Sequence, residues 1–267
     1  MTKRITLIGA GRMGSALAGG WLKAGRAGQI DIIDPAPADA VQAWIEARRV
    51  RHNPAPEPAD ILVVAVKPQV FGALAAEITQ RIGPNTQVLS IMAGLSLATL
   101  EAKLGTGNVV RAMPNTPGLV GKGVTILCTK PETPEETTNE VRSLLEPLGA
   151  VEGPISEDLL SVATAVSGCG PAYGFLLAEV MAAAGTAHGL ESDLAMRLAR
   201  KTVEGAGALM EGSPEDATTL RRNVTSPNGV TQAALEVLMS PEAMPSLFEK
   251  AIGAAIARDV ALSKETE

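Results

Sequence analysis

Aromatic side chains are scarce in this sequence of 267 residues, which has six of them: Trp21, Trp44, Phe71, Tyr173, Phe175 and Phe248. Because 46% of the residues are still apolar, the core has to be built mainly from Ala, Val, Leu and Ile. Such small and aliphatic side chains favour close packing of helices. The length suits one large domain or two ordinary ones.

Cysteine and histidine are equally rare, with two of each. Cys128 and Cys169 have neither CxxC nor metal-ligand spacing, so we expect two reduced cytosolic thiols and no metal site. His52 lies in a proline-rich loop with no obvious partner, and His188 precedes Gly189 at a helix end, where we expect a structural role. The histidine base of a 2-hydroxy-acid dehydrogenase therefore has no good candidate.

A basic run is also lacking, and the net charge is −6, which argues against nucleic acid or an acidic membrane surface as a partner. The N-terminal stretch has no signal-peptide pattern, and no uninterrupted apolar stretch is long enough to cross a bilayer. We therefore expect a soluble, cytoplasmic protein with no membrane partner.

Strand-like and helix-like stretches alternate through the first half of the chain, and only helical patterns occur from Ser156 onward. Strands are expected over 4–9, 29–35, 60–68, 86–94, 108–115 and 123–129, and helices over 12–25, 37–48, 70–81 and 96–104. This rhythm predicts a mostly parallel sheet with helices on both faces. The expected fold is an α/β Rossmann-type doubly wound sheet over 1–153, followed by an all-α domain over 154–267.

The stretch "IGAGRMG" contains GxGxxG at Gly9, Gly11 and Gly14. It follows a strand, opens a helix and lies in a βαβ unit, which is the context that dinucleotide binding needs. Gly9 permits the tight turn, Gly11 lets the backbone approach a pyrophosphate, and Gly14 lets helix and strand pack closely. The free N–H groups of the helix start then bind the phosphates, unless the stretch is a plain glycine-rich turn.

Asp34 ends the second strand, twenty residues after the last glycine of that motif. An acidic residue there accepts hydrogen bonds from the adenosine ribose and repels a 2′-phosphate, which favours NADH over NADPH. Two alternatives stay open: Asp34 only caps the turn at Pro35, or Arg12 still reaches a 2′-phosphate. Prolines also end two later strands, at "AVKPQ" (65–69) and "AMPNTP" (112–117), which either line the cofactor groove or form ordinary turns.

The stretch "TSPNGVT" (225–231) predicts the start of a helix, with Ser226 as the cap and Pro227 in the first helical position. Two other helix starts, "TPEE" and "SPED", add acids that answer the positive end of the helix dipole. This one has no acid, and Asn228 and Gly229 tolerate unusual backbone angles. It suits an external carboxylate, unless it is merely an irregular helix start.

A second unusual stretch, "VSGCGPAYGF" (166–175), breaks a helical pattern with small residues, so a ligand or a partner subunit could come close there. A chain without a histidine base can still reduce an imine. A protonated C=N already carries a positive charge, so it needs little further activation by an acid or base. The enzyme then mainly aligns a nicotinamide with the carbon and holds the substrate. A hydroxyl such as that of Thr231 could hydrogen-bond the nitrogen.

With these residues assembled, the chain resembles the pyrroline-5-carboxylate reductase family nearly end to end. The resemblance rests on "IGAGRMG", "AVKPQ", "SIMAGLSL", "VRAMPNTP", "SGCGPAY" and "NVTSPNGVTQAAL", of which the last three are specific to the family. It implies NAD(P)H-dependent reduction of (S)-1-pyrroline-5-carboxylate to L-proline, the last step of proline biosynthesis, by hydride transfer to a protonated cyclic imine. It also implies that the helical domain serves dimerisation and substrate binding, in a homodimer or a ring of dimers.

Carried over residue by residue, the resemblance makes the "TSPNGVT" turn the site of the substrate carboxylate, with Thr231 as the catalytic residue nearest the ring nitrogen. The positions that match the family's substrate-binding residues are Ser226, Gly229, Val230 and Thr231, and we expect Asn228 of the same turn to join them. The cofactor-binding set is Ile8, Gly9, Ala10, Gly11, Arg12, Met13, Gly14, Asp34, Asn53, Ala65, Val66, Lys67, Pro68 and Ala93.

The sequence departs from the family's usual SPGGTT or SPGGAT at Asn228 and Val230, and Cys169 replaces the serine of SGSGPAY. Asn can adopt a left-handed backbone angle and so keep the turn, whereas Cys is a weaker hydrogen-bond donor than Ser. Two other functions are considered. One is a β-hydroxyacid dehydrogenase that uses Lys201, a residue that otherwise belongs to a solvated helix face. The other is a nucleotide-binding regulatory relative without turnover.

Overall fold

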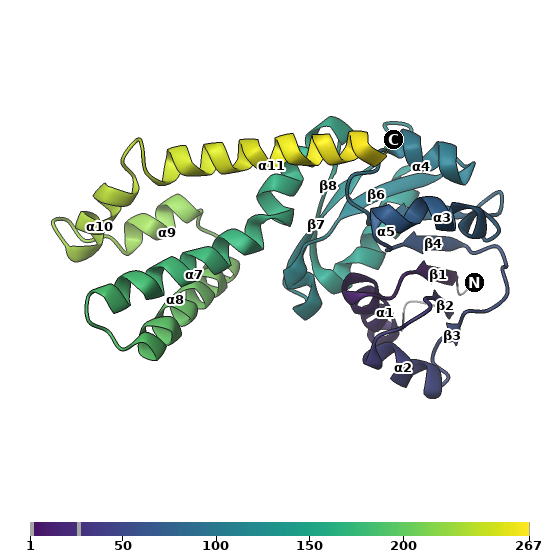
Figure 1. The fold of residues 1–267 in the computed structure, drawn as a ribbon, viewed down its shortest axis with the longest axis horizontal. Coiled ribbons are helices and arrows are strands. Elements are labelled where there is room, and N and C mark those ends of the chain that lie inside the picture. The colour runs from purple at the N-terminus through teal and green to yellow at the C-terminus, as the bar shows by residue number, and fades with distance from the viewer. Residues whose placement is uncertain (1–2, 26–27, 267) are drawn as a thin grey trace. The chain divides into compact units, whose positions relative to one another are not determined.

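The computed structural model describes residues 3–25 and 28–266, which form two compact units (Figure 1). The first unit comprises the chain up to Gly168 together with the residues from Ile256 onward. The second comprises Cys169–Ala255. The long helix α11 (Met244–Thr266) therefore contributes residues to both units.

One eight-stranded sheet forms the centre of the first unit, within the part of the chain that the structure describes. The strands lie in the order β3-β2-β1-β4-β5-β6-β7-β8, and neighbours pair in parallel except β6 with β7. Their bounds are β1 (Arg4–Ile8), β2 (Gln29–Ile33), β3 (Arg51–His52), β4 (Ile61–Val64), β5 (Gln87–Ser90), β6 (Val109–Met113), β7 (Gly123–Cys128) and β8 (Gly149–Ile155). The order of the first six is that of the doubly wound dinucleotide-binding fold, which confirms the predicted fold class.

Helices cover both faces of this sheet (Figure 1). They are α1 (Arg12–Ala24), α2 (Asp39–Glu46), α3 (Pro68–Thr79), α4 (Leu97–Leu104), α5 (Glu135–Leu145) and α6 (Leu160–Ala163). One apolar layer contains Leu17, Val41 and Val141 from α1, α2 and α5, and the other contains Phe71 and Leu100 from α3 and α4. The sheet is thus buried on both sides, as the continuous apolar run of β4 predicts.

Two edge strands, β3 and β8, differ from the expectation, whereas the other six coincide with predicted stretches. β3 has only two residues, Arg51 and His52, and both are polar. β8 alternates exposed with half-buried positions and contains Gly153 and Pro154, two residues that weaken strands. Neither edge strand has the apolar run by which a buried strand is recognised.

The boundary between the units lies later than the last strand. β8 ends at Ile155, next to the expected domain boundary, but the compact units divide after Gly168. The reason is that α6 buries Leu160 in the apolar layer of the sheet. In addition, Ser161 Oγ donates a hydrogen bond of 2.7 Å to Asp259 Oδ2, which ties the end of α11 to the first unit.

The second unit is helical throughout the residues that the structure describes in it. Its helices are α7 (Gly170–Ala187), α8 (Ser192–Gly212), α9 (Ala217–Asn223) and α10 (Val230–Leu238), followed by the first part of α11. α7 and α8 pack through Ala178, Ala182, Ala195 and Ala199. These small side chains allow the close helix packing that the composition predicts.

By length and composition alone, the helical stretch Glu157–Ala187 is long and apolar enough to cross a membrane. Its most apolar 18 residues have a mean hydropathy of 1.3, and 11% of them are buried. The expectation that no stretch reaches this length is therefore not met. The stretch is not one regular helix, because a π-helical turn at Thr164–Gly168 precedes α7. A helix that packs against protein passes the same test, and α7 does pack against α8.

Candidate active site

A pocket of about 670 Å³ opens in the first unit where β1, β2 and β4 end. Its lining includes eight of the residues expected to bind the cofactor: Ile8, Gly9, Gly11, Asp34, Asn53, Ala65, Val66 and Lys67. Ligands in parallel sheets bind beyond the carboxyl ends of the strands, and this pocket is in that place. Of the two proline-ended stretches, "AVKPQ" reaches the pocket.

The "AMPNTP" stretch lies outside the lining of this pocket. Its Asn115 is buried and has a structural role. The side-chain carbonyl of Asn115 accepts a hydrogen bond of 2.9 Å from Val124 N, and its amide donates one of 3.0 Å to Ser167 O. Through these two bonds the Asn115 side chain ties β7 to the π-helical turn.

The glycines of the loop between β1 and α1 meet different requirements. Gly9 has φ +90°, and an added Cβ would come within 2.9 Å of Ala65 O. A Cβ on Gly14 would come within 2.2 Å of Gly9 O, so only glycine allows the helix this close to the strand. A Cβ on Gly11 would meet nothing within 4 Å, so this position is open to a ligand. The geometry matches the role of each glycine in a dinucleotide-binding loop.

The N-terminus of α1 also fits a phosphate. Within the described residues, no side chain caps Gly11 and the first turn has no acidic residue. The first helical hydrogen bond runs from Ser15 N to Gly11 O, at 2.8 Å. The preceding N–H groups, those of Arg12, Met13 and Gly14, therefore point out of the helix start, where they can bind an anion.

Asp34 makes two backbone contacts through its side chain. Its Oδ1 accepts a hydrogen bond of 2.8 Å from Ala36 N, so it does cap the turn at Pro35. Its Oδ2 accepts one of 2.6 Å from Ala10 N, which ties the end of β2 to the glycine-rich loop. Each carboxylate oxygen has a further lone pair, so Asp34 can still accept a hydrogen bond from a ribose hydroxyl.

Asn53 and His52 hold Asp34 from the other side. Asn53 has φ +44° and bonds the main chain of Asp34 twice: its Oδ1 accepts from Asp34 N at 3.0 Å, and its Nδ2 donates to Asp34 O at 3.1 Å. His52 Nε2 lies 2.9 Å from the same carbonyl oxygen. The expectation that His52 has no partner is wrong, because His52 belongs to the edge strand β3, which pairs with β2 and so brings the ring to Asp34.

Six of the expected cofactor residues are not in the lining of the pocket: Ala10, Arg12, Met13, Gly14, Pro68 and Ala93. Ala10 is buried and acts through its N–H to Asp34. Pro68 is the first residue of α3, directly after Lys67, which lines the pocket. Ala93 is exposed in the turn after β5.

The structure adds one face of α3 to the pocket, which the sequence did not predict. Its residues are Val70, Ala73, Leu74, Glu77 and Ile78. Their spacing of three and four residues was a usable signal, since it puts them on one side of a helix that begins at a strand end. They form a largely apolar wall opposite Asp34 and Asn53.

In the second unit, α10 begins at Val230 with Gly229 as its N-cap. The expectation of a cap at Ser226 with Pro227 in the first helical position is therefore wrong by three residues. Asn228 has φ +55°, which interrupts the helix, and Gly229 N donates to Ser226 O at 3.0 Å. Proline followed by a residue with positive φ, closed by this bond, is the pattern of a type II turn.

The other two helix starts also begin later than the sequence indicated. α9 begins at Ala217, and Asp216 is its cap, accepting a hydrogen bond of 2.7 Å from Thr219 N. α5 begins at Glu135 with Pro134 before it, so its first turn keeps the two expected acids. The contrast with α10 remains: within the described residues, no side chain caps Gly229 and no acid lies in the first turn.

One N–H next to this helix start does have a partner in the chain. Asn228 N donates a hydrogen bond of 2.8 Å to Gln232 Oε1, and Gln232 Nε2 donates one of 2.9 Å to Glu236 Oε1. We expected no group of the chain to pair with the N–H groups of this helix start, and for Asn228 that expectation is wrong. The first helical hydrogen bond is from Ala233 N to Gly229 O, so the N–H groups of Val230, Thr231 and Gln232 precede it and face outward.

The "SGCGPAY" stretch forms the start of α7. Tyr173 packs edge-on against Phe248, with ring centroids 5.7 Å apart. Burial, and then the neighbouring Cys169 thiol, raise the pKa of Tyr173, so its hydroxyl keeps its proton at neutral pH. No group of three or more His, Cys, Asp or Glu side chains in residues 3–25 and 28–266 is placed to hold a metal ion.

Lys201 lies on α8, as expected of the alternative dehydrogenase. Its Nζ donates a hydrogen bond of 2.7 Å to Glu204 Oε2, and the two side chains are 78% and 66% exposed. The hydrogen bond from Lys201 lowers the pKa of Glu204. The pair is a solvated ion pair on a helix surface, and His188 caps the end of α7 as expected of a structural residue.

Known proteins resemble this chain over its whole length. One family model, described as pyrroline-5-carboxylate reductase dimerisation, matches residues 157–262, and another, described as NADP oxidoreductase coenzyme F420-dependent, matches residues 4–94. The pyrroline-5-carboxylate reductase of Pseudomonas aeruginosa is 36% identical over 99% of this chain and 98% of its own.

Two solved structures extend the likeness to the fold. A pyrroline-5-carboxylate reductase from Coxiella burnetii has a TM-score of 0.89 at 32% identity and covers 98% of this chain and 99% of its own. The Plasmodium falciparum pyrroline carboxylate reductase with NADP bound has a TM-score of 0.79 at 29% identity over 98% of both chains.

Proposed function

Since the chain belongs to the pyrroline-5-carboxylate reductase family, we propose that it reduces (S)-1-pyrroline-5-carboxylate to L-proline with NAD(P)H, the last step of proline biosynthesis. The observation that carries the proposal is the start of α10, where an uncapped helix terminus without acids follows the turn at Asn228. A carboxylate is the ligand that such a terminus attracts.

The first unit binds the dinucleotide in this proposal. Its pocket joins an uncapped helix start, a glycine with an open side and an acidic residue at the end of β2, which together fit a pyrophosphate and a ribose. The bound cofactor supplies the hydride. We assign a preference for NADH, because the Asp34 carboxylate lines the pocket where a 2′-phosphate would otherwise lie, and like charges repel.

The second unit binds the substrate. The N–H groups of Val230, Thr231 and Gln232 receive the carboxylate, and the small residues of the turn, Ser226 and Gly229 among them, leave room for the ring. The Thr231 hydroxyl lies in the first turn of α10, where it can hydrogen-bond the ring nitrogen. Since a protonated imine is already electrophilic, the chain has no need of a histidine base.

Self-association belongs to the same proposal. α7 exposes large apolar side chains, including Phe175 at 70% and Val180 at 50%, although α8 already covers one side of the helix. A chain of a dimerising family with such a helix buries it against a second copy, rather than in a bilayer. We propose a homodimer or a ring of dimers, working in the cytoplasm.

The test mixes the purified protein with pyrroline-5-carboxylate and NADH or NADPH and follows the absorbance of the reduced nicotinamide. Consumption of the reduced nicotinamide with formation of proline supports the proposal. A protein that binds NADH without oxidising it would instead be the nucleotide-binding regulatory relative. Faster turnover with NADPH than with NADH would overturn only the cofactor preference.

Two variants test the assignment of residues. Thr231→Ala lowers kcat about tenfold and leaves cofactor affinity unchanged, since it removes one hydrogen bond at the reacting nitrogen. Thr202→Ala is the matched control, because that hydroxyl bonds Leu198 O on the surface of α8. Lys201→Ala keeps normal turnover; loss of activity in this variant would favour the β-hydroxyacid dehydrogenase.

A further inference from the structure

The loop between β3 and β4 is rich in proline. Three of its residues, Pro54, Pro56 and Pro58, lack an N–H group, so the segment "PAPEP" can form few backbone hydrogen bonds of its own. Its carbonyl groups need donors from elsewhere in the chain. This segment follows Asn53 directly, and Asn53 lines the pocket of the first unit.

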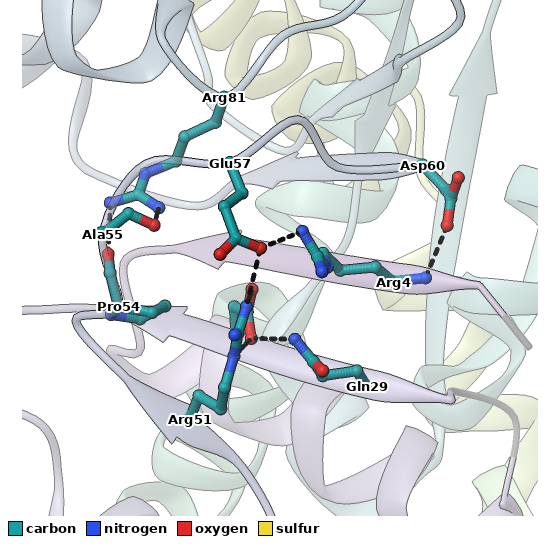
Figure 2. A network of polar contacts seen from close by, with 9 residues as sticks. Arg4, Gln29, Arg51, Pro54, Ala55, Glu57, Asp60 and Arg81 are labelled. Atoms are coloured by element: carbon teal, nitrogen blue, oxygen red, sulfur yellow. Dashed lines mark hydrogen bonds and ion pairs between the residues drawn. The ribbon is translucent and has the colours of Figure 1, made fainter.

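Arg81 supplies these donors (Figure 2). It lies just beyond the end of α3 and is 3% exposed. Its Nη2 donates a hydrogen bond of 3.1 Å to Pro54 O, and its Nη1 a longer one of 3.5 Å to Ala55 O. The main-chain carbonyl of Arg81 accepts a hydrogen bond of 3.0 Å from Ala59 N. One residue thus holds both ends of the loop.

A separate set of ion pairs holds the middle of the loop (Figure 2). Glu57 Oε2 lies 2.5 Å from Arg4 Nη1 and 3.6 Å from Arg51 Nη2. Arg51 in turn donates two hydrogen bonds of 2.7 Å to the carboxylate of the buried Asp31. These contacts fix Glu57 against arginines of β1 and β3 but do not touch Pro54 or Ala55, which are held by Arg81.

A short chain of contacts leads from Arg81 to the ligand-binding groups. Pro54 follows Asn53, whose side chain bonds both the N–H and the carbonyl of Asp34. Asp34 bonds Ala10 N in the glycine-rich loop. Asn53 also has a positive φ of 44°, an unusual angle for a residue with a side chain, so it needs its neighbours to hold it.

The burial of Arg81 is costly for a purely structural residue. Its Nε is buried and has no hydrogen-bond partner among the described residues, and Glu77 Oε1 is 3.8 Å from Nη2. An apolar side chain would fill the same space without desolvating a cation. What an apolar side chain would not provide is the pair of donors to the loop.

We propose that Arg81 is a positioning residue for the adenosine half of the dinucleotide, acting through Pro54 and Ala55 on Asn53 and Asp34. The inference rests on the proposed function only in that this pocket binds NAD(P)H. It assigns Arg81 an effect on cofactor affinity and none on the imine, because the contacts of Arg81 lead to Asn53 and Asp34 in the dinucleotide pocket.

The experiment compares Arg81→Met, which keeps the apolar stem but removes the donors, with Arg81→Lys, which keeps one charged donor. Arg142→Met is the matched control, because Arg142 also donates to two carbonyls, those of Val151 and Gly153, at the far edge of the sheet. Calorimetry measures the Kd of NADH and of ADP-ribose for each variant. Steady-state kinetics gives kcat and the KM of pyrroline-5-carboxylate at saturating NADH.

Arg81→Met is expected to raise the Kd of both NADH and ADP-ribose about tenfold, with Arg81→Lys between it and the unmodified protein. The KM of the imine and kcat at saturating NADH stay within about twofold, and Arg142→Met binds both ligands normally. An unchanged Kd in folded Arg81→Met overturns the proposal, and so does an equal loss of cofactor affinity in Arg142→Met. If Arg81→Met does not fold, an unchanged Kd in Arg81→Lys overturns it. Because calorimetry needs no turnover, a protein that binds NADH but does not reduce the imine contradicts only the proposed function.

Discussion

The backbone amide of Ala10 donates a hydrogen bond of 2.6 Å to Oδ2 of Asp34, and this contact joins the glycine-rich loop to the end of β2. In the proposed function, this one carboxylate links the two ends of the dinucleotide site, with the loop at the pyrophosphate and Asp34 at the ribose. A change at Asp34 affects both ends at once.

We expect Asp34→Ser to reduce kcat/KM for NADH by about tenfold and that for NADPH by much less. The substitution removes the carboxylate that accepts hydrogen bonds from the ribose hydroxyls. It also removes the negative charge that repels a 2′-phosphate. Initial rates with the two cofactors measure the ratio. Asp60→Ser is the control, because Asp60 also accepts a backbone hydrogen bond, from Arg4 N at 2.7 Å, but does not line the pocket. An unchanged ratio in Asp34→Ser would contradict the assignment.

Asn228 gives a second prediction, which concerns the backbone. Its φ of +55° is accessible to Gly and Asn but costs an alanine about 1–2 kcal/mol. Asn228→Ala should therefore raise the KM of the imine about tenfold with little change in kcat, whereas Asn228→Gly stays close to the unmodified protein. Asn223→Ala, at the end of α9, is the matched control. Equal KM values for the alanine and glycine variants would show that the turn does not set the affinity.

The sequence predicted the buried parts of the fold and the tight glycine-rich loop after β1, because both depend on local patterns. β4 is recognisable as a continuous apolar run, and Gly9 and Gly14 as positions where a Cβ has no room. It did not predict β8, whose half-exposed edge position needs no apolar run. The helix starts were also misplaced, because a proline such as Pro227 suits a tight turn as well as a first helical turn.

The contacts that hold the site depend on residues distant in sequence, and no local pattern encodes them. The hydrogen bond of Arg81 to Pro54 spans 27 positions, and the contact of His52 with Asp34 needs β2 and β3 to be neighbours. Gln232 is different, since its bond to Asn228 lies within one turn. It was missed because a glutamine in a helix has no strong positional preference by itself.

Cys128 gives a prediction about pH. Burial in β7, with the nearby Glu157 carboxylate, raises the pKa of this thiol to about 11. The thiol therefore stays protonated in the native protein at pH 8, and only the thiolate reacts with alkylating reagents. In a Cys169→Ser background, we expect iodoacetamide to leave Cys128 unmodified until the protein is unfolded with urea. Rapid labelling of the native protein at pH 8 would contradict this burial.

The same shift has a consequence for stability. Because the folded state holds the Cys128 proton more tightly than the unfolded chain does, this residue's contribution is complete below the ordinary thiol pKa of about 8.5 and is lost as the pH rises towards about 11. The urea midpoint of the unmodified protein should therefore fall more steeply across that range than the midpoint of Cys128→Ala. Parallel curves for the two proteins would count against the shift.

The exposed apolar face of α7 gives the last prediction. Phe175 and Val180 are 70% and 50% exposed within one chain, and a charge at either position would be buried in a subunit interface without a partner. We expect Phe175→Asp and Val180→Asp to shift the protein to monomer in light scattering coupled to size exclusion. Val120→Asp is the matched control, since Val120 is 76% exposed but belongs to the first unit and lies outside the dimerisation match. Each variant needs a native circular dichroism spectrum, because a monomer that has lost its helices would report unfolding rather than dissociation. If both α7 variants keep the native mass, the copies associate through another surface.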